Sequence, residues 1–357
     1  MGLTPLMPPS RDRADRGVTM DEVARVAGVS QATVSRVVNG NPRVNSDAKR
    51  QVERAIERLG FVPNIAARTL VTRRSDSIGV VITEPTTRVF GDPFFAQVLR
   101  GVSTALAARR QKLVLFLPQD AAEERDLAPY HAAGHVDGVI MYSLHGADPL
   151  PEQLHRRGVP VVVGGLPPTG AKVSYVDNDN RGGALLATRH LLDVGRRRIA
   201  TIAGPPDMPA AIDRREGYRE ALSEAGIAPD MALEVEGAFT QESGVEAMRS
   251  LLARQADLDA IFVANDLMAA GAIQVLQATG RRVPEDVAVV GFDDAPIALT
   301  TQPTLTSVRQ SLDAMGRELV NLVLGSIEHP DQVARKVVLS TELVVRHSSG
   351  GSPTEQA

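Results

Sequence analysis

The chain has 357 residues, no cysteine and a formal net charge of −4, and its length predicts two or three domains rather than one hydrophobic core. Without cysteine it can form neither disulfide bridges nor thiolate metal sites, which is typical of a cytoplasmic protein. It contains no apolar run of about 18 residues, so a membrane-spanning helix is excluded.

The charge is distributed unevenly along the chain. Residues 1–74 carry 13 Lys and Arg against 7 Asp and Glu, whereas the remaining residues carry 26 against 36. A basic N-terminal part on an otherwise acidic chain indicates that any nucleic acid is bound there. The first 16 residues hold three prolines and five charges without the apolar segment of a signal peptide. We therefore predict a disordered extension over residues 1–17.

Residues 18–62 are predicted to begin with two short helices joined by a tight turn. Their apolar positions at helical spacing are Val23, Val26, Ala27, Val34, Val37 and Val38. Gly28 ends the first helix and can adopt the positive φ of a sharp turn, and Ser30 is a suitable N-cap for the second helix. This pattern is typical of a helix-turn-helix, whose second helix enters the major groove of DNA.

The outward face of the second helix is polar and carries no acidic side chain. The residues on this face are Gln31, Ala32, Ser35 and Arg36. Such a face favours a phosphate-lined groove over bulk water, although an ordinary helical hairpin is the alternative. A third helix is predicted with Ser46 as its N-cap and Gly60 at its end.

Residues 63–75 are predicted to form a hinge helix and linker. Pro63 can open a helix, but only one or two turns follow before a polar stretch. Isolated helices below about 12–15 residues are marginal in water, so this segment is expected to order only against a partner. A flexible linker is the alternative.

From residue 76 to residue 346, apolar runs alternate with helical segments. The predicted strands are 78–82, 113–117, 138–141, 159–163, 198–203, 232–236, 259–263 and 287–291. The predicted helices are 94–109, 120–133, 150–157, 181–194, 214–225, 243–253 and 266–279. This alternation predicts parallel sheets covered on both faces. Its two rounds predict two α/β lobes with a cleft lined by polar residues at the carboxyl ends of the strands. Residues 347–357, rich in Ser, Gly and Pro, are predicted to be a disordered tail.

Other chemistry is disfavoured by the residues present. His131 and His135 lie one helical turn apart, but without a third ligand nearby they are interpreted as solvated surface histidines. The acidic segment 177–182 resembles a calcium loop but has Arg181 where an oxygen ligand is needed. We expect no metal, no cofactor and no catalytic residues. An enzyme on the same α/β frame is one alternative function, and a plain sugar-binding protein is another.

Several separate segments, in the same order, resemble the LacI/GalR family of bacterial transcription regulators. They are Met20–Ala24, Gly28–Ser30, Thr33–Gly40, Phe61–Asn64, Asp92–Phe95, Ala264–Asp266 and Gly291–Asp294. The resemblance covers nearly everything from Val18 to Arg346. It implies an all-α helix-turn-helix headpiece, a hinge helix, and an α/β effector domain of two lobes with parallel sheets, similar to periplasmic sugar-binding proteins.

The same resemblance implies roles in DNA binding. The family's base-reading positions fall on Gln31, Ala32 and Arg36, and its phosphate-contacting positions fall on Thr19, Ser30, Thr33, Ser35 and Asn39. The chemistry agrees, since Gln pairs with adenine and Arg binds guanine bidentately. Ala67 and Leu70 match hinge positions that enter the minor groove, where an apolar wedge kinks the duplex.

The resemblance also implies an effector site in the cleft. The matching positions are Asp92, Phe94, Asp179, Arg214, Phe239, Asn265 and Asp293, with Asp92 standing where many members carry Asn. Asp and Arg can hydrogen-bond sugar hydroxyls, and Phe offers a face to apolar C–H groups. Core packing of either Phe, a turn-capping Asp293 and a solvated Arg214 remain alternatives.

The implied function is a repressor that binds double-stranded operator DNA under the control of a small-molecule effector, expected to be a sugar. The C-terminal part lacks a leucine-rich heptad. We therefore expect a homodimer rather than the four-stranded assembly of some members.

Overall fold

The computed structural model describes residues 18–38, 41, 43–62, 74–167 and 171–350. The chain divides between Arg74 and Ser75 into two compact units, called here the headpiece and the body. Asn39, Ala67, Leu70, residues 63–73 of the predicted hinge and linker, and the predicted extension over 1–17 lie outside the described residues.

The headpiece is built from three helices, α1 (Met20–Ala27), α2 (Gln31–Val38) and α3 (Ser46–Leu59). Gly28 and Gly60 end α1 and α3 in the left-handed region, with φ of 67° and 63°, where a residue with a Cβ would be strained. The buried core consists of Val23, Ala24, Ala27, Val34, Val52, Ala55 and Phe61.

Two details of the headpiece correct the sequence analysis. Val26 is exposed, because the buried stripe of this short helix runs through Val23, Ala24 and Ala27 instead. The N-cap of α3 is Asn45, whose side chain accepts a hydrogen bond from the Asp47 N–H. Ser46 is therefore the first helical residue, because an Asn carboxamide reaches the backbone donors of the first turn from one position earlier.

The body contains two six-stranded sheets. The first sheet has the order β11-β5-β4-β3-β1-β2, with strands β1 (Ser77–Ile82), β2 (Lys112–Phe116), β3 (Gly138–Tyr142), β4 (Val161–Gly164), β5 (Ser174–Asn178) and β11 (Lys336–Leu339). The second has the order β12-β10-β9-β8-β6-β7, with strands β6 (Ile199–Ala203), β7 (Glu234–Glu236), β8 (Ala260–Val263), β9 (Ala288–Asp293), β10 (Thr306–Arg309) and β12 (Glu342–Val344). Among the described strands every pairing is parallel except β10 with β12.

Helices cover both faces of each sheet, as continuous apolar strands require. The first lobe carries α5 (Thr86–Gly91), α6 (Pro93–Ala107), α7 (Ala121–Ala132), α8 (Leu150–Arg156) and α13 (Leu312–Glu328). The second carries α9 (Asn180–Asp193), α10 (Pro209–Glu224), α11 (Gln241–Arg254) and α12 (Asp266–Ala278). Helices α6 and α13 share one core with β1 and β3, whereas α7 and α8 form the core of the opposite face. Three 3₁₀ turns, at Met231–Leu233, Pro296–Leu299 and His347–Ser349, complete the second lobe.

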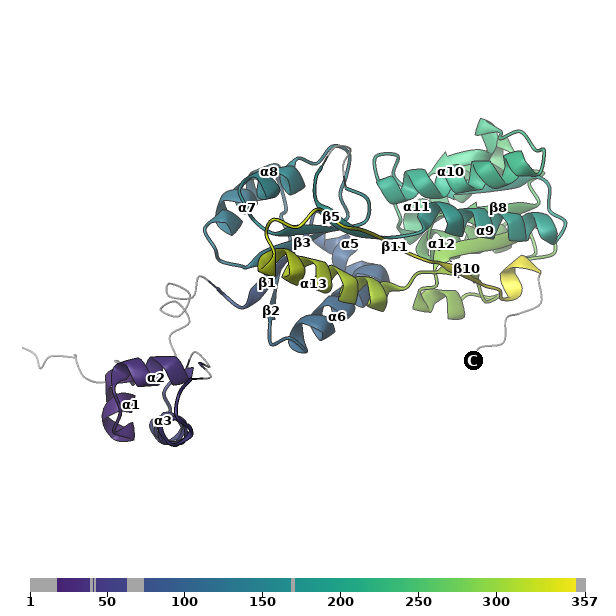
Figure 1. Cartoon of the computed structure of the whole chain (residues 1–357). Helices are drawn as coiled ribbons and strands as arrows, with labels where there is room; N and C mark the ends of the chain where they lie inside the picture. The colour runs from purple at the N-terminus through teal and green to yellow at the C-terminus, as the bar shows by residue number, and fades with distance from the viewer. Residues whose placement is uncertain (1–17, 39–40, 42, 63–73, 168–170, 351–357) are drawn as a thin grey trace, which may run out of the picture. The chain divides into compact units, whose positions relative to one another are not determined.

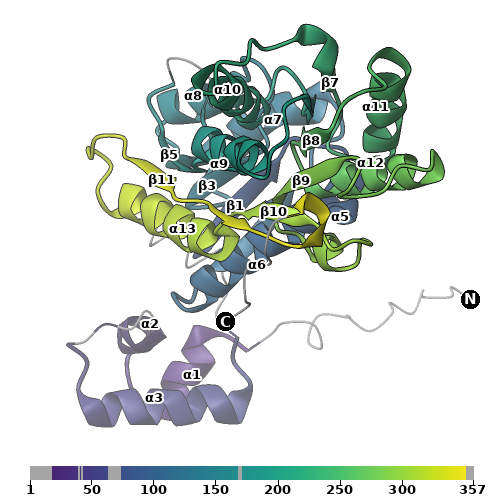
Figure 2. The same ribbon diagram turned by 90° about the vertical axis from the view of Figure 1, so that its right-hand side faces the viewer.

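The fold class is confirmed, but the two lobes are not two consecutive halves of the chain. After β10 the chain returns to the first lobe as α13 and β11, and then crosses again to form β12. Figures 1 and 2 show α13, near the C-terminus, lying beside α6. The lobes are therefore joined by three short crossings, between residues 178 and 180, 309 and 312, and 339 and 342.

The prediction of a disordered tail over 347–357 is wrong for its first residues. Ser348 and Ser349 are fully buried. Ser348 Oγ accepts a hydrogen bond from the Thr306 N–H at 2.9 Å and donates to the Val289 carbonyl at 2.6 Å. A serine-rich segment is usually read from sequence as a loop. Here a serine side chain instead provides the hydrogen-bond partners of two buried backbone groups at the end of the sheet. Within the described part of the chain, no helix has the length and apolar character needed to cross a membrane.

These contacts predict that truncation after Arg346 lowers the free energy of unfolding of the body by about 2–4 kcal/mol, because each buried polar group left unpaired costs about 1–3 kcal/mol. Urea unfolding measures the change. Truncation after Gly350, which keeps both serines, is the control. Equal stabilities of the two truncated chains would contradict the structural role of Ser348.

Candidate functional sites

Those predicted DNA contacts that the structure describes lie on the accessible face of α2 and at the N-termini of the first two helices. Gln31, Ala32 and Arg36 are exposed, whereas Thr33 and Ser35 are half-buried. The first turn of α2 carries no acidic residue. An anionic groove can therefore approach the N-terminus of α2 without meeting a like charge.

Two of the predicted phosphate contacts also hold the helices in place. Thr19 forms a capping box with Glu22 at the start of α1. Ser30 Oγ accepts a hydrogen bond from the Thr33 N–H at 3.2 Å and lies 2.9 Å from Thr33 Oγ1, so Ser30 is the cap of α2 as expected. These hydroxyls fix the orientation of the helix starts, whatever further contact they make.

The second site is a cavity in the body, at the carboxyl ends of strands from both sheets. Six of the seven predicted effector residues line it, namely Asp92, Phe94, Arg214, Phe239, Asn265 and Asp293. The cavity measures about 100 Å³, whereas ligand pockets typically measure about 300–1,000 Å³. The lobes are therefore closed on each other, and a ligand of ordinary size requires them to move apart.

Asp179, the seventh predicted residue, is exposed and does not line the cavity. Its carboxylate accepts a hydrogen bond from the Gly182 N–H and caps α9. Asp177, Asn178 and Asn180 line the cavity instead. The local pattern of alternating Asp and Asn did not distinguish these positions, because only the register of β5 decides which of them face inward.

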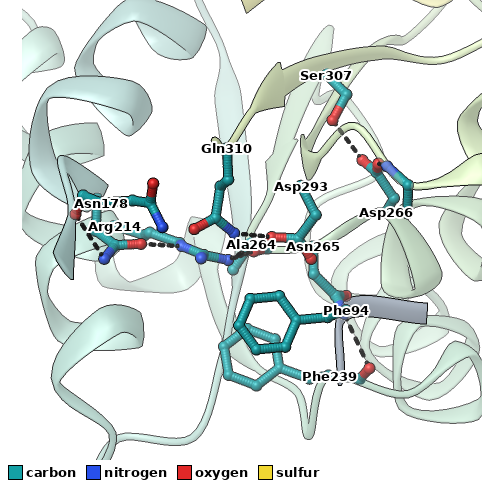
Figure 3. A network of polar contacts seen from close by, with 12 residues as sticks. Phe94, Asn178, Arg214, Phe239, Ala264, Asn265, Asp266, Asp293, Ser307 and Gln310 are labelled. Carbon is teal, nitrogen blue, oxygen red and sulfur yellow. Dashed lines mark hydrogen bonds and ion pairs between the residues drawn. The ribbon is translucent and has the colours of Figure 1, made fainter. Parts of the chain in front are cut away.

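Arg214 is the centre of a buried polar network (Figure 3). Its Nε donates to Asn180 Oδ1 at 2.8 Å, and its Nη1 donates to the Ala264 carbonyl at 2.5 Å and lies 3.4 Å from Asp293 Oδ1. The guanidinium also lies 3.7 Å from the centre of the Phe292 ring. The alternative of a solvated surface arginine is therefore wrong.

Asp293 is held between this arginine and Gln310, whose Nε2 donates to Asp293 Oδ1 at 2.6 Å. Burial raises the pKa of Asp293 to about 7, although Arg214 and the Gln310 hydrogen bond oppose the shift. Burial also raises the pKa of Asp177 to about 7 and raises that of Asp92. Burial in the closed cavity thus disfavours the charged forms of several carboxylates. A polar ligand that donates hydrogen bonds to these carboxylates would offset that cost.

Asn265 and Asp92 have structural roles beside the cavity. Asn265 Oδ1 accepts a hydrogen bond from the Met268 N–H and caps α12, while Nδ2 donates to the Phe239 carbonyl at 2.9 Å. That second bond supports Phe239 at a φ of 60°, a strained conformation for a bulky residue. Asp92 caps α6 through the Phe94 N–H at 2.9 Å. Each cap also fixes the position of a phenyl ring at the cavity.

Three further polar atoms at the cavity are buried without a hydrogen-bond partner in the described part of the chain. They are Arg88 Nε, Tyr142 Oη and Asn178 Oδ1. A buried polar group without a partner costs about 1–3 kcal/mol, so such groups are expected where a ligand supplies the partner. Sequence reasoning missed Arg88, Tyr142, Asn178 and Gln310, since none belongs to a periodic pattern or to a matched segment.

Asp266 lies behind the cavity and has a purely structural environment. Its carboxylate accepts hydrogen bonds from Ser307 Oγ at 2.6 Å and from the Ala295 N–H at 2.7 Å, as Figure 3 shows for Ser307. Burial raises its pKa well above the ordinary value. A Cβ at Gly291 would lie 2.2 Å from Asp266 Oδ1, so this close approach requires the glycine. The contact joins the ends of β8, β9 and β10.

The interpretation of His131 as a surface histidine is wrong. Its ring is buried, lies 4.7 Å from the Phe116 ring and 5.6 Å from the Tyr130 ring, and has no hydrogen-bond partner on either nitrogen in the described residues. Burial lowers its pKa to about 4. His135 instead stacks on Tyr130 at 4.3 Å. Among the described residues no group of three or more His, Cys, Asp or Glu is arranged to hold a metal ion.

Comparison with known proteins identifies the family of each part of the chain. Residues 19–64 match the model of bacterial regulatory proteins of the lacI family, and residues 188–349 match a periplasmic binding protein-like domain. The HTH-type transcriptional regulator CelR of Thermobifida fusca is 49% identical over 335 residues, which cover 93% of this chain and 98% of that protein. The chain belongs to the LacI family.

Two solved structures of LacI-family regulators resemble the whole chain. The complex of the transcriptional regulator CelR with cellobiose is 47% identical, has a TM-score of 0.75, and covers 93% of this chain and 99% of its own. The Lac repressor dimer bound to operator and the anti-inducer ONPF is 26% identical, has a TM-score of 0.83, and covers 94% of this chain and 99% of its own. This LacI-family member is accordingly a DNA-binding transcriptional regulator and not an enzyme.

The double role of Asn265 predicts the effect of removing it. Asn265→Ala should lower the free energy of unfolding of the body by about 2 kcal/mol, since a lost N-cap costs about 1 kcal/mol and a lost hydrogen bond about another. Urea unfolding measures the loss. Gln274→Ala, on the exposed face of the same helix, is the control and should change little. A stability equal to that of the parent chain would show that neither bond contributes.

Proposed function

We propose that this regulator is a homodimeric repressor whose affinity for operator DNA is controlled by a disaccharide such as cellobiose, bound between the two lobes. The observation that carries the proposal is the cavity itself, which both lobes line with three phenyl rings (Phe94, Phe95 and Phe239), carboxylates and unpartnered polar atoms. Rings and hydrogen-bonding groups in one cavity are what a sugar requires, because it presents apolar C–H faces and a rim of hydroxyls.

The relative solved with cellobiose supports the choice of ligand, since it is 47% identical and aligned over 93% of this chain. Phe94 and Phe239 would contact the sugar faces. Asp92, Arg214 and Asp293 would hydrogen-bond hydroxyls, and Asn265 would hold Phe239 in place. Asp179, at the start of α9, would act only through the orientation of that helix.

The headpiece would read DNA through α2. Gln31, Ala32 and Arg36 would contact base edges, and Thr19, Ser30, Thr33, Ser35 and Asn39 would contact phosphates. Ala67 and Leu70, in the hinge over residues 63–75, would enter the minor groove at the operator centre. Two headpieces in a symmetric dimer would occupy the half-sites of a near-palindromic operator. The Lac repressor dimer bound to operator supports this arrangement.

Effector and operator would be linked reciprocally. If the disaccharide changes operator affinity by some factor, operator DNA changes disaccharide affinity by the same factor. The test is titration of cellobiose into the full chain by calorimetry, with and without a duplex selected from random sequence for tight binding. If titration of cellobiose produced no heat of binding, cellobiose would be excluded as the effector. Equal cellobiose affinity with and without the duplex would show that cellobiose does not control operator binding.

The base-reading role of Arg36 predicts a change in specificity. Arg36→Ala should weaken binding to the selected duplex by about 1–3 kcal/mol and relax base preference at one position in each half-site, since a bidentate base contact is worth about that much. Repeating the selection with the variant measures the preference. Arg58→Ala, an exposed arginine at the end of α3, is the control. An equal loss on random duplex would instead make Arg36 a phosphate contact.

The position of the Phe94 ring at the cavity predicts that this ring contributes to effector affinity and not to DNA binding. Phe94→Ala should weaken cellobiose binding by about tenfold to a hundredfold, because burying a phenyl ring contributes about 1.5–3 kcal/mol. Calorimetry measures the affinity, and binding to operator without effector should be unchanged. Phe90→Ala removes the same side chain from neighbouring α5, where it is 75% exposed, and is the matched control. Equal affinities of the two variants would exclude Phe94 from the site.

A further inference from the structure

A histidine joins the two lobes beside the cavity. His145 follows β3 of the first lobe, and its ring lies between two carboxylates. Its Nε2 is 3.0 Å from Glu84 Oε1, in the first lobe, and its Nδ1 is 3.0 Å from Asp207 Oδ2, in the second lobe. The neighbouring Gly146 N–H also donates to the Asp207 carbonyl, at 2.9 Å.

The protonation state of this histidine follows from its two partners. An ionised carboxylate can only accept hydrogen bonds, so an imidazole that faces a carboxylate with each nitrogen must donate from both. Only the imidazolium form carries a proton on both nitrogens. A neutral ring would turn a lone pair toward one of the carboxylates, and one of the two bonds would be lost.

The histidine is connected to the cavity through Glu84. That carboxylate is almost fully buried, accepts a hydrogen bond from Ser143 Oγ at 2.6 Å, and pairs with Arg88 Nη1 at 2.5 Å. Both Ser143 and Arg88 line the cavity. The Arg88 guanidinium lies 5.8 Å from the ring of Phe95, in the first lobe, and 5.2 Å from that of Phe239, in the second.

We propose that His145, when protonated, is a latch that holds the two lobes closed over the cavity, so that closure binds a proton and opening releases one. The latch is the pair of hydrogen bonds from His145 to Glu84 and Asp207. It gives the regulator a dependence on pH in addition to its effector. The proposal that the latch holds the lobes closed depends only on these contacts. Its effect on sugar affinity rests on the proposed function.

The surrounding charges support this assignment. Three carboxylates act on His145, those of Glu84, Asp207 and Asp148, and Arg88, which contacts the same Glu84 oxygen, is paired with that carboxylate. The hydrogen bond to Glu84 raises the pKa of His145 most, against partial burial, and the bond to Asp207 adds to the rise. Burial would raise the pKa of Glu84, but its bonds to His145, Arg88 and Ser143 hold it below the ordinary value.

The sign of the effect follows from linkage. Because the closed form has the higher histidine pKa, the latch is complete below the ordinary histidine pKa and is lost as the pH rises through the raised value. Mildly acidic conditions should therefore favour the closed lobes, and an alkaline shift should favour opening. Histidine is the side chain that can do this near neutral pH.

The test measures the distance between the lobes without any effector. The chain has no cysteine, so Arg156→Cys on α8 and Ser223→Cys on α10, both exposed, provide one spin label on each lobe of the full chain. The ratio of closed to open lobes should fall by roughly tenfold to a hundredfold between about pH 5.5 and pH 8, as expected for the loss of one hydrogen bond to a charged group.

Variants separate the latch from a general effect of pH. His145→Gln should reduce the pH dependence to the part contributed by the cavity carboxyls of Asp177 and Asp293, whose pKa burial raises to about 7. Asp207→Asn, at a half-exposed position, should also reduce the pH dependence while leaving the fold intact. His155→Gln, an exposed histidine of the same lobe, should keep the parent profile. A parent chain whose lobe distance does not change with pH, or a His145→Gln variant that keeps the profile, would overturn the latch.

A second measurement distinguishes this proposal from the proposed function. Cellobiose affinity of the parent chain should be lower at the acidic end of the same range, because the latched lobes must move apart to admit a disaccharide, and that of His145→Gln should depend less on pH. Absence of cellobiose binding at every pH would refute the ligand, while the effector-free lobe distance would still decide the latch. Equal pH dependence of affinity in both proteins would overturn the latch itself.

Discussion

The buried guanidinium of Arg214 is the interaction on which the body most depends. A charge taken out of water is tolerated only when acceptors surround it, and removing one partner of a buried pair costs about 3–5 kcal/mol. Its acceptors come from Asn180 at the start of α9, Ala264 after β8 and Asp293 at the end of β9. Gln310, on the crossing into α13, holds Asp293 in turn. One side chain thus ties together two of the three crossings between the lobes.

At this site the same residues cap helices and line the cavity. This double role has a physical cause. Parallel strands deliver their carboxyl ends to one edge of the sheet, where the following helices begin. A residue there must satisfy the free N–H groups of a first turn, as Asp92 and Asn265 do. Both residues also line the cavity. A mutation of either residue is therefore expected to change both the stability of the body and its affinity for ligand. The Phe94 ring caps no helix, so a mutation of Phe94 tests ligand binding without removing a cap.

Sequence patterns predicted the strands that are apolar throughout, such as β1 and β3, and the headpiece helices with their glycine ends. They missed β5 and β10, whose sequences are at least half polar, and the short edge strands β11 and β12, which are stabilised by pairing across distant segments rather than by local propensity. The return of α13 to the first lobe depends on its packing against α6, a contact no local signal encodes. For the same reason the sequence indicated Asp179 rather than Asp177, and placed His131 in solvent.

The first residues of the body are held against the first lobe by one carboxylate. The Asp137 carboxylate, next to β3, accepts hydrogen bonds from the Ser75 N–H at 2.6 Å, from Ser75 Oγ at 2.8 Å and from the Asp76 N–H at 3.0 Å. Such charge-assisted bonds are about twice as strong as neutral ones. They fasten Ser75 to the strand that also leads to His145. The first two residues of the body are therefore fixed to the first lobe by hydrogen bonds to a single carboxylate.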